Sequence, residues 1–385
     1  MKNVMIQFRT VGVSPHLNSF CRGLGARVKD FRLVVTSARY SAMREKIGWS
    51  AKADYSVAID SDELRAQALE TDILIDMLRE TQIFEARAKK KKKTFYISER
   101  WFKPYVLFNR FGFALKVSGI LRLLVPKYLK MARRFVRLMD ESSFYVLPIG
   151  VHAVCDIVRM YKILKGEWKY FFFKPVVVVD KHLGGGVKGF PRVHLWAYFV
   201  ESSVSSRPMR NLSSDSTLKI LWVGRMLDWK RVDVLIMAFR QLKRAAALLL
   251  VGEGPERRRL ERLSGPLKAI GVSGCQWVRN KIVFHDYVKS SVVRSLMREA
   301  SVYVMPSNEE EGWGAVVSEA LREGCPVVST FEAGSAITLL SPDVLFNSGD
   351  VKALVQILEV ANTISSPDGN CEWSGDKAAQ FLLSL

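Results

Sequence analysis

Two glutamates with seven residues between them, Glu311 and Glu319, flank a glycine-containing turn in the C-terminal half of the chain. An apolar run, Val302–Met305, precedes this turn, and Gly312 and Gly314 fall where a helix should begin. A helix start offers unpaired backbone N–H groups and a positive dipole end, which together favour a bound phosphate. Glycines let a ligand approach this backbone closely. The pattern suits a nucleotide-sugar, with its diphosphate on the amides and its sugar and ribose hydroxyls on the two carboxylates.

Three further motifs precede this turn, and each follows an apolar run that predicts a β-strand. They are Gly224-Arg225 followed by Lys230, Gly252-Glu253-Gly254-Pro255, and His285-Asp286-Tyr287. Ligands of open α/β sheets bind outside the carboxyl ends of the strands. We therefore expect all four motifs to border one site.

The four motifs, in this order, resemble the signature of retaining glycosyltransferases with the GT-B fold, of the type called family 4 or glycosyl transferases group 1. The pair Glu311 and Glu319 is similar to the E-x7-E element of that family. The N-terminal half resembles the family only through Val13-Ser-Pro-His16 and Ser98-Glu99-Arg100-Trp101. The resemblance implies two Rossmann-like domains that face each other across a cleft, and a role in bacterial cell-surface polysaccharide synthesis.

The resemblance also implies roles for the matching residues. Arg225 and Lys230 would hold the donor diphosphate and stabilise the charge that develops on the leaving group. Glu311 would bind the hydroxyls of the donor sugar and Glu319 those of the ribose, although Glu309 and Glu310 leave the register open by one residue. The other expected donor contacts are Gly224, Glu253, Gly312, Trp313 and Gly314.

One position departs from the family pattern. Arg231 stands where the family often has glycine, which makes the local backbone less certain.

Candidate acceptor-side residues come from the N-terminal half. His16 follows the first predicted strand, and Glu99 and Arg100 follow the predicted strand 94–97. A carboxylate beside an arginine could orient an acceptor hydroxyl, while a histidine without any role is an equally good reading of His16.

No metal or other cofactor is expected, because the family that this chain resembles uses none. Asp60-Ser-Asp62 follows a short apolar run, as in metal-dependent transferases of another fold. We set this motif aside, because it is very short and aspartate also starts helices. The five cysteines show no metal-ligand spacing, and their odd number argues for reduced thiols rather than a disulfide framework.

The positive charge of the chain is concentrated in one segment. The formal net charge is +20, and residues 87–137 hold sixteen Lys and Arg against one acid, Glu99, which gives 16 − 1 = +15. Within it, segment 111–138 alternates aromatic residues and leucines with cations at helical spacing. This composition is typical of an interfacial helix on an anionic bilayer. A core helix with a solvated basic face and a nucleic-acid contact are the alternatives, and no nucleic-acid motif supports the last.

Alternating strand and helix patterns predict an α/β protein with parallel sheets. We expect an acceptor-binding domain over 1–205, a nucleotide-sugar-binding domain over 206–365, and a terminal helix over 366–385 that crosses back to the first domain. Expected strands lie at 3–8, 31–35, 73–75, 94–97, 144–147, 196–199, 218–223, 247–251, 282–284, 302–305 and 326–329. Expected helices lie at 16–27, 61–69, 153–164, 232–243, 255–263, 291–299, 315–323 and 350–361.

These observations favour a cytoplasmic glycosyltransferase, peripheral on the inner face of the cell membrane. The sequence shows neither a signal peptide nor an apolar run as long as a membrane span. The expected reaction moves a hexose-type unit from a nucleoside-diphosphate sugar to a saccharide or lipid-linked acceptor, with retention. The rivals are a nucleotide-sugar epimerase or hydrolase, a basic nucleic-acid-binding protein, and a non-catalytic membrane-docked subunit.

Overall fold

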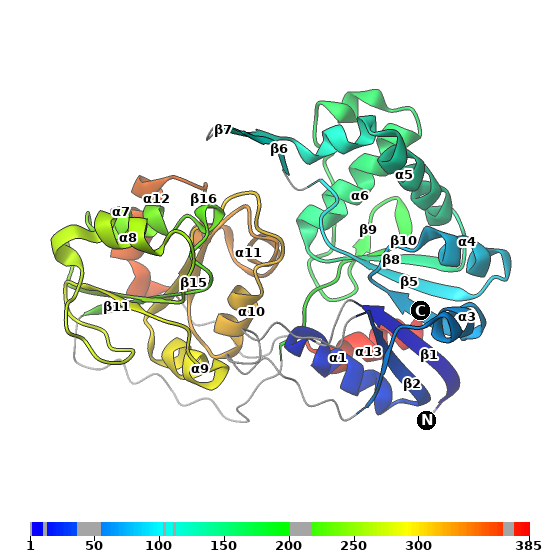
Figure 1. The fold of residues 1–385 in the computed structure, drawn as a ribbon, viewed down its shortest axis with the longest axis horizontal. Coiled ribbons are helices and arrows are strands. Elements are labelled where there is room, and N and C mark those ends of the chain that lie inside the picture. The colour runs from blue at the N-terminus through cyan, green and yellow to red at the C-terminus, as the bar shows by residue number, and fades with distance from the viewer. Residues whose placement is uncertain are drawn as a thin grey trace. The chain divides into compact units, whose positions relative to one another are not determined.

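The computed structural model describes residues 2–10, 14–36, 55–102, 105–110, 113–200, 217–364 and 373–385. The chain divides into two compact α/β units (Figure 1). Unit 1 comprises 1–45, 50–201 and 372–385, and unit 2 comprises 46–49 and 202–371. The boundaries expected at residues 206 and 366 fall outside the described residues.

Unit 1 is built on an eight-stranded sheet in the order β3-β2-β1-β4-β5-β8-β10-β9. All neighbours pair in parallel except β10 and β9. The strand order reverses on either side of β1, so the carboxyl ends of β1 and β4 form the switch point where such sheets bind ligands. The strands are β1 (Lys2–Thr10), β2 (Val28–Val35), β3 (Ser56–Ile59), β4 (Ile73–Asp76), β5 (Lys93–Ser98), β8 (Phe144–Pro148), β9 (Gly186–Val187) and β10 (Phe190–His194).

Helices pack against this sheet, and a separate hairpin joins β5 to the helices that follow. The α-helices are α1 (Pro15–Gly25), α3 (Asp62–Glu70), α4 (Thr81–Lys89), α5 (Pro126–Met139), α6 (Val151–Leu164) and α13 (Gly375–Ser384). The remaining elements are the hairpin β6 (Tyr105–Arg110) and β7 (Phe113–Val117), and the 3-10 helices η1 (Gly119–Leu124) and η2 (Trp168–Phe171).

The last helix, α13, belongs to unit 1 and packs against α1. The two helices approach closely because small residues face each other: a Cβ added at Gly23 would lie 3.0 Å from the Cβ of Ala379. Arg27 pairs with Asp376 at 2.7 Å across the same contact. The ring of Phe381 lies 5.3 Å from that of His194, which connects α13 to the end of β10.

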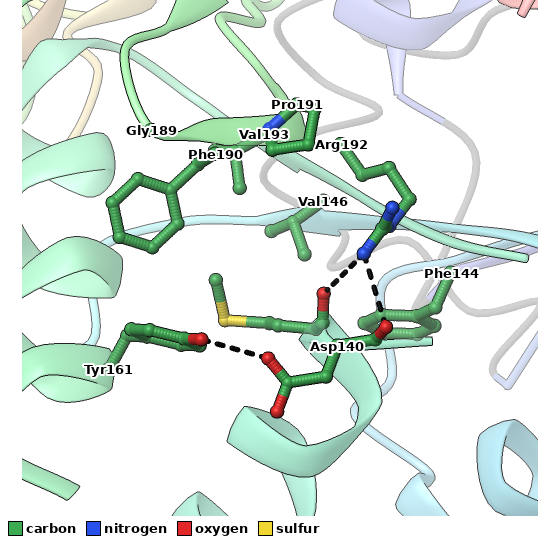
Figure 2. A pocket seen from close by; sticks show the side chains of 10 residues that line it. Asp140, Phe144, Val146, Tyr161, Gly189, Phe190, Pro191, Arg192 and Val193 are labelled. Atoms are coloured by element: carbon green, nitrogen blue, oxygen red, sulfur yellow. Dashed lines mark hydrogen bonds between the residues drawn. The ribbon is translucent and has the colours of Figure 1, made fainter. Parts of the chain in front are cut away.

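The C-terminal end of α5 is tied to its neighbours by polar contacts (Figure 2). Arg192 donates to the carbonyl of Met139 at 3.3 Å and to that of Asp140 at 3.2 Å, which satisfies acceptors at the helix end. Tyr161 donates to Asp140 Oδ1 at 2.8 Å. These residues line a pocket of about 80 Å³, too small for a nucleotide-sugar, since ligand sites usually measure roughly 300–1,000 Å³.

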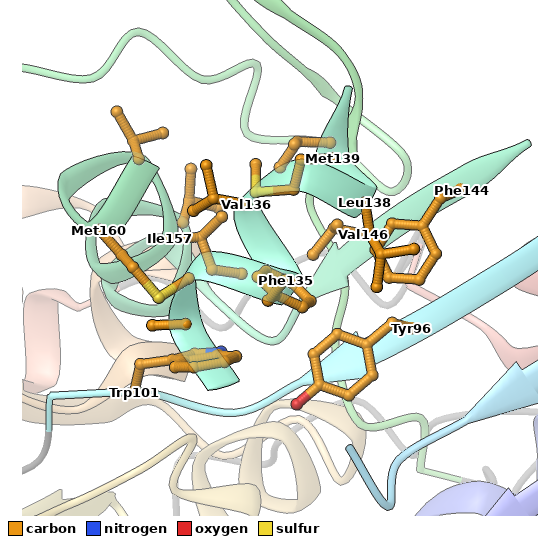
Figure 3. Close-up of a cluster of buried hydrophobic side chains, with 14 of the residues drawn as sticks. Tyr96, Trp101, Phe135, Val136, Leu138, Met139, Phe144, Val146, Ile157 and Met160 are labelled. Atoms are coloured by element: carbon orange, nitrogen blue, oxygen red, sulfur yellow. The ribbon is translucent and has the colours of Figure 1, made fainter. Parts of the chain in front are cut away.

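The apolar face of α5 is buried in the core of unit 1 (Figure 3). Phe135 packs with its ring centroid 4.9 Å from that of Trp101 and 5.2 Å from that of Tyr96. The opposite face is exposed and carries four cations one turn apart: Lys127, Lys130, Arg133 and Arg137. Helix α5 is therefore a core helix with a solvated basic face, which was the alternative to an interfacial helix. Its apolar face is not available to a bilayer.

Two expectations for unit 1 are wrong. Segment 111–138 is not one helix, because strand β7 and the 3-10 helix η1 precede α5, which begins at Pro126. Proline suits the first turn of a helix but breaks its interior. The run 196–199 is also not a strand, since only Trp196 forms an isolated bridge, to Ile149.

Unit 2 contains a parallel six-stranded sheet in the order β13-β12-β11-β14-β15-β16. Successive residues of β11 enter different apolar clusters, with Ile220 and Trp222 in one and Leu221 in the other. Both faces are thus covered, as in parallel sheets generally. The strands are β11 (Leu218–Val223), β12 (Ala246–Val251), β13 (Ile282–His285), β14 (Val302–Met305), β15 (Val327–Thr330) and β16 (Leu345–Phe346).

All five strands expected in the second half are confirmed, and β16 is an addition to them. The helices of unit 2 are α7 (Val232–Phe239), α8 (Arg257–Ser264), α9 (Ser290–Glu299), α10 (Ala315–Arg322), α11 (Gly334–Leu339) and α12 (Val351–Glu359). The 3-10 helices are η3 (Asp228–Lys230), η4 (Gly265–Leu267), η5 (Pro342–Val344) and η6 (Ala361–Thr363). Within the ranges described above, no helix of the chain is both long and apolar enough to cross a membrane.

Candidate active site

Lys230 and Glu311 form an ion pair in unit 2, with Nζ 2.5 Å from Oε2. Both side chains are shielded, at 15% and 7% exposure, so the pair is held in a surrounding of low dielectric. The backbone brings them together, because the N–H of Asn308 donates to the carbonyl of Trp229 at 2.9 Å. The loop after β11 is thereby joined to the loop after β14.

The pair distinguishes Glu311 from the two glutamates that precede it. Glu311 is buried, whereas Glu309 is exposed and Glu310 is half-buried. Only the register that starts at Glu311 places the carboxylate on Lys230.

The turn Gly312-Trp313-Gly314 is fixed by contacts with the start of α11. Gly334 donates to the carbonyl of Gly312 at 2.9 Å, and Ser335 donates to that of Trp313 at 2.8 Å. Gly314 has φ +76°, and an added Cβ would lie 2.9 Å from the Cε of Met305. Glycine is therefore required at this position, where the chain turns into α10.

Trp313 differs from the expectation of a donor contact. Its side chain is only 3% exposed, and its indole Nε1 donates to Ser318 Oγ at 3.1 Å. The buried ring holds the turn in place, so only the backbone of Trp313 can contact a ligand.

Tyr303 is a site residue that the sequence did not reveal. Its phenol is fully buried in β14 and donates to the carbonyl of Val223, the last residue of β11, at 3.4 Å. Burial raises its pKa well above 10, and the negative charges of Glu311 and Glu319 raise it further. The charges of both glutamates therefore act on one phenol. The only signal was a tyrosine within an otherwise apolar strand.

The loop after β12 contains two glycines, which allow it to pass directly beside the loop after β11. A Cβ at Gly252 would lie 1.9 Å from the carbonyl oxygen of Gly224, and one at Gly254 would lie 2.4 Å from that of Met226. The N–H of Met226 donates to the carbonyl of Glu253 at 2.7 Å. This packing fixes the backbone on either side of Arg225.

Arg225 is exposed, and no ion pair with another described residue engages its guanidinium. It lies near Tyr287. Burial raises the pKa of this tyrosine, and the charge of Arg225 partly opposes that rise. The phenol of Tyr287 donates to the carbonyl of Glu253 at 3.2 Å. Arg225 is thus a positive group on a fixed loop, with its charge available to an anion.

Residues 217–361 match the family model of the glycosyl transferases group 1. An uncharacterized glycosyltransferase of Methanocaldococcus jannaschii is 28% identical over 202 residues, 51% of this chain and 47% of that protein. The 2-deoxystreptamine N-acetyl-D-glucosaminyltransferase of Streptomyces fradiae is 32% identical over 144 residues, 35% of this chain and 31% of that protein. These matches span less than half of each relative.

Solved structures extend the likeness to the whole chain. Anabaena HepE in complex with UDP and glucose superposes with a TM-score of 0.55 at 14% identity, over 99% of this chain and 95% of that chain. A lipopolysaccharide outer core galactosyltransferase gives 0.53 at 14% identity, over 98% and 94%. The chain has the GT-B fold. The match to the group 1 glycosyl transferases lies within unit 2, and unit 1 is the other Rossmann-like domain of the fold.

The three candidate acceptor-side residues, His16, Glu99 and Arg100, have different partners within unit 1. Glu99 accepts a hydrogen bond from the phenol of Tyr198 at 2.6 Å, and the ring of His16 lies 6.0 Å from the same tyrosine. Burial and then the charge of Glu99 raise the pKa of Tyr198 well above 10. Arg100 is instead 3.5 Å from the buried Asp156. The structure therefore brings His16 and Glu99 together and directs Arg100 elsewhere.

The Asp60-Ser-Asp62 motif is divided between two environments. The side chain of Asp60 is 5% exposed and pairs with Arg65 at 2.9 Å and with Arg9 at 3.5 Å, whereas Asp62 is fully exposed. Arg9 also pairs with Asp76 at 3.3 Å. In the part of the chain that the structure describes, no three His, Cys, Asp or Glu side chains are grouped to hold a metal ion.

Proposed function

We propose that this protein is a glycosyltransferase that moves a hexose-type unit from a nucleoside-diphosphate sugar to a saccharide or lipid-linked acceptor. The observation that carries the proposal is the Lys230–Glu311 pair beside a glycine turn at the start of α10, with Arg225 on the neighbouring loop. The Anabaena relative of this fold binds UDP-glucose, which supports a donor of the same chemical class.

Each part of the donor has a matching group in unit 2. The amides of the turn and the N-terminal end of α10 offer donors and a positive dipole to the diphosphate. Arg225 and Lys230 add two cations beside it. Glu311 accepts hydrogen bonds from hydroxyls of the sugar, and Glu319, half-buried on α10, accepts them from the ribose.

The proposed reaction proceeds on one face of the sugar, with retention. The bond between the anomeric carbon and the diphosphate oxygen breaks, and a bond from the anomeric carbon to the acceptor oxygen forms. The acceptor proton passes to the departing phosphate oxygen, so that the products are the glycoside and a nucleoside diphosphate. Lys230 and Arg225 stabilise the charge that develops on this leaving group. No metal is part of this proposal.

The acceptor side of the proposal rests on unit 1. In this proposal His16 and Glu99, which both contact Tyr198, orient an acceptor hydroxyl. The basic segment 87–137, with the exposed cations of α5, suits an anionic membrane surface on the cytoplasmic side rather than nucleic acid.

Calorimetric titration of UDP, GDP and ADP into the full chain, without metal, tests the donor site. We expect one diphosphate to bind, and Arg225→Ala to weaken it about tenfold or more, since hydrogen bonds to charged groups contribute roughly 1.5–3 kcal/mol. Arg225 is exposed, so this variant should fold normally. Arg258→Ala, an exposed arginine on α8, is the matched control and should bind like the parent.

Two results would overturn the proposal. One is the absence of binding for all three diphosphates at millimolar concentration, and the other is equal affinity in the parent and Arg225→Ala. Product analysis with a bound donor distinguishes transfer from hydrolysis, because a hydrolase releases free sugar whether or not an acceptor is present.

A further inference from the structure

An exposed strip of aromatic and apolar side chains follows α6 in unit 1. Of the twelve large hydrophobic side chains that stand exposed among the described residues, five fall within residues 168–178. Scattered exposed hydrophobic residues are normal, but a contiguous patch marks a contact surface. The members of this aromatic strip are Trp168 (65% exposed), Phe172 (80%), Phe173 (68%), Val176 (95%) and Val178 (59%).

The strip is held on a rigid scaffold. The guanidinium of Arg159 in α6 donates to the carbonyl of Tyr170 at 2.6 Å and to that of Phe171 at 2.9 Å. The side chains of Tyr170, Phe171, Val177 and Val179 pack against the core of unit 1. The segment therefore has an inner face that is anchored and an outer face that presents the strip to solvent.

Lysines are interleaved with the strip. Lys169 and Lys174 are exposed within it, and the N–H of Lys188 donates to the carbonyl of Val178 at 3.1 Å, which places a third exposed lysine beside its end. The single acid of residues 162–178, Glu167, is paired with Lys162 at 3.2 Å. Four lysines and one glutamate give this segment 4 − 1 = +3, and one of the four, Lys165, is paired at 2.8 Å with Asp140 outside the segment.

The segment that carries the strip lies beside α6, because Arg159 of that helix holds the carbonyls of Tyr170 and Phe171. Lys174 lies near Cys155 in the first turns of α6, since its positive charge lowers the pKa of that thiol against the larger effect of burial, which raises it. The next residue, Asp156, pairs with Arg100. One end of the strip is thus near the part of unit 1 that carries Glu99 and Arg100.

We propose that the aromatic strip is the surface by which this protein docks on an anionic lipid bilayer. Tryptophan and phenylalanine side chains enter the headgroup boundary, and lysines beside them bind anionic lipids. A partner surface of opposite charge is required, because the strip is both apolar and positive. The apolar face of α5 is buried, so that helix can supply only cations to the same contact.

Docking through the strip would determine from which side of unit 1 the acceptor reaches the site. A lipid-linked acceptor in the docked bilayer would lie on the side of unit 1 where the strip approaches Arg100. The position of the acceptor rests on the proposed function, whereas the docking itself does not. Donor titration tests the function and vesicle binding tests the docking, so either can fail without the other.

Sedimentation of the full chain with vesicles tests the docking. We compare phosphatidylcholine vesicles with vesicles that contain phosphatidylglycerol in addition. Binding is expected to the anionic vesicles only. The variant Phe172→Ser with Phe173→Ser should lower the partition coefficient at least about tenfold. Lys169→Glu with Lys174→Glu should lower it about 30-fold or more, since each cation contributes roughly 1 kcal/mol.

Ile270→Ser is the matched control, because Ile270 is 91% exposed in unit 2. It should bind vesicles like the parent, and all variants should keep the thermal unfolding midpoint of the parent. The proposal is overturned if the parent binds no vesicles, if it binds neutral vesicles equally, or if the phenylalanine variant binds undiminished. A dimeric parent that becomes monomeric in that variant without any vesicle binding would instead assign the strip to a second copy.

Discussion

At the scale of single residues, the site depends on backbone conformations as much as on charges. Arg231 directly follows Lys230 and adopts the left-handed conformation, with φ +48° and ψ +39°. Side chains other than glycine disfavour this conformation by roughly 1–2 kcal/mol. The side chain of Arg231 also pairs with Asp233 at 3.2 Å. The glycine-like geometry therefore persists here although the glycine is absent.

We expect Arg231→Gly to be more stable than Arg231→Ala by about 1 kcal/mol. Both variants lose the ion pair with Asp233, so their difference isolates the backbone term. Urea unfolding of the two variants measures it. Equal stabilities would show that the loop rearranges around residue 231.

At the scale of elements, the loops after β11, β12 and β14 form one packed unit. Gly252 shows what this packing requires, because an added Cβ would lie 1.9 Å from the backbone oxygen of Gly224. A contact of that length cannot exist without movement of one loop. The position of Arg225 therefore depends on a glycine in a neighbouring loop.

Gly252→Ala should destabilise the protein by about 2 kcal/mol or more and weaken diphosphate binding as well. Gly265→Ala is its control, since Gly265 also has a positive φ, +53°, but no neighbouring atom within 4 Å of the added Cβ. The control should cost about 1–3 kcal/mol, since its ψ of −132° lies outside the left-handed helical region, and should leave binding unchanged. Thermal unfolding and calorimetry check both statements, and an equal loss of diphosphate affinity in the two variants would contradict them.

The sequence predicted unit 2 better than unit 1 for physical reasons. The runs at β11, β12 and β14 are short, apolar and followed by glycine or polar residues, so their type and their ends could be recognised. In segment 111–138, apolar and basic residues alternate in a way that fits several structures, and only Pro126 marks the real start of α5. Edge strand β16 has two residues, too few for any periodic pattern.

For the site, the spacing of residues in the sequence was informative, but their contacts with residues distant in the sequence could not be predicted. The seven-residue spacing predicted that Glu319 would face the same mouth as Glu311, and the charges of both act on the phenol of Tyr303. Tyr303 itself and Tyr198 were missed, because their roles depend on strands and loops far away in the chain. Burial of the Trp313 ring could not be foreseen, since it follows from the packing of α10.

At the scale of the whole molecule, the end of the chain stabilises its beginning. Leu382 in α13 is 1% exposed within unit 1, although all of unit 2 separates it from α1 in the sequence. Leu382→Ala should destabilise unit 1 by about 2–5 kcal/mol, as large-to-small changes in cores do.

Urea unfolding followed by tryptophan fluorescence measures that loss. Diphosphate binding at unit 2 should stay at the parental affinity, because no residue of α13 belongs to that unit. A fall in diphosphate affinity under native conditions would show that the stability of unit 2 depends on α13.

The return of α13 to unit 1 also sets an order for folding during synthesis. Every residue of unit 2 between 202 and 371 leaves the ribosome before α13 does, so its parallel sheet can be completed first. Unit 1, although it begins first, keeps the surface of α1 around Gly23 uncovered until the final helix has emerged. The nascent chain thus carries an unfinished first domain throughout the translation of the second, and chaperones have that interval in which to act.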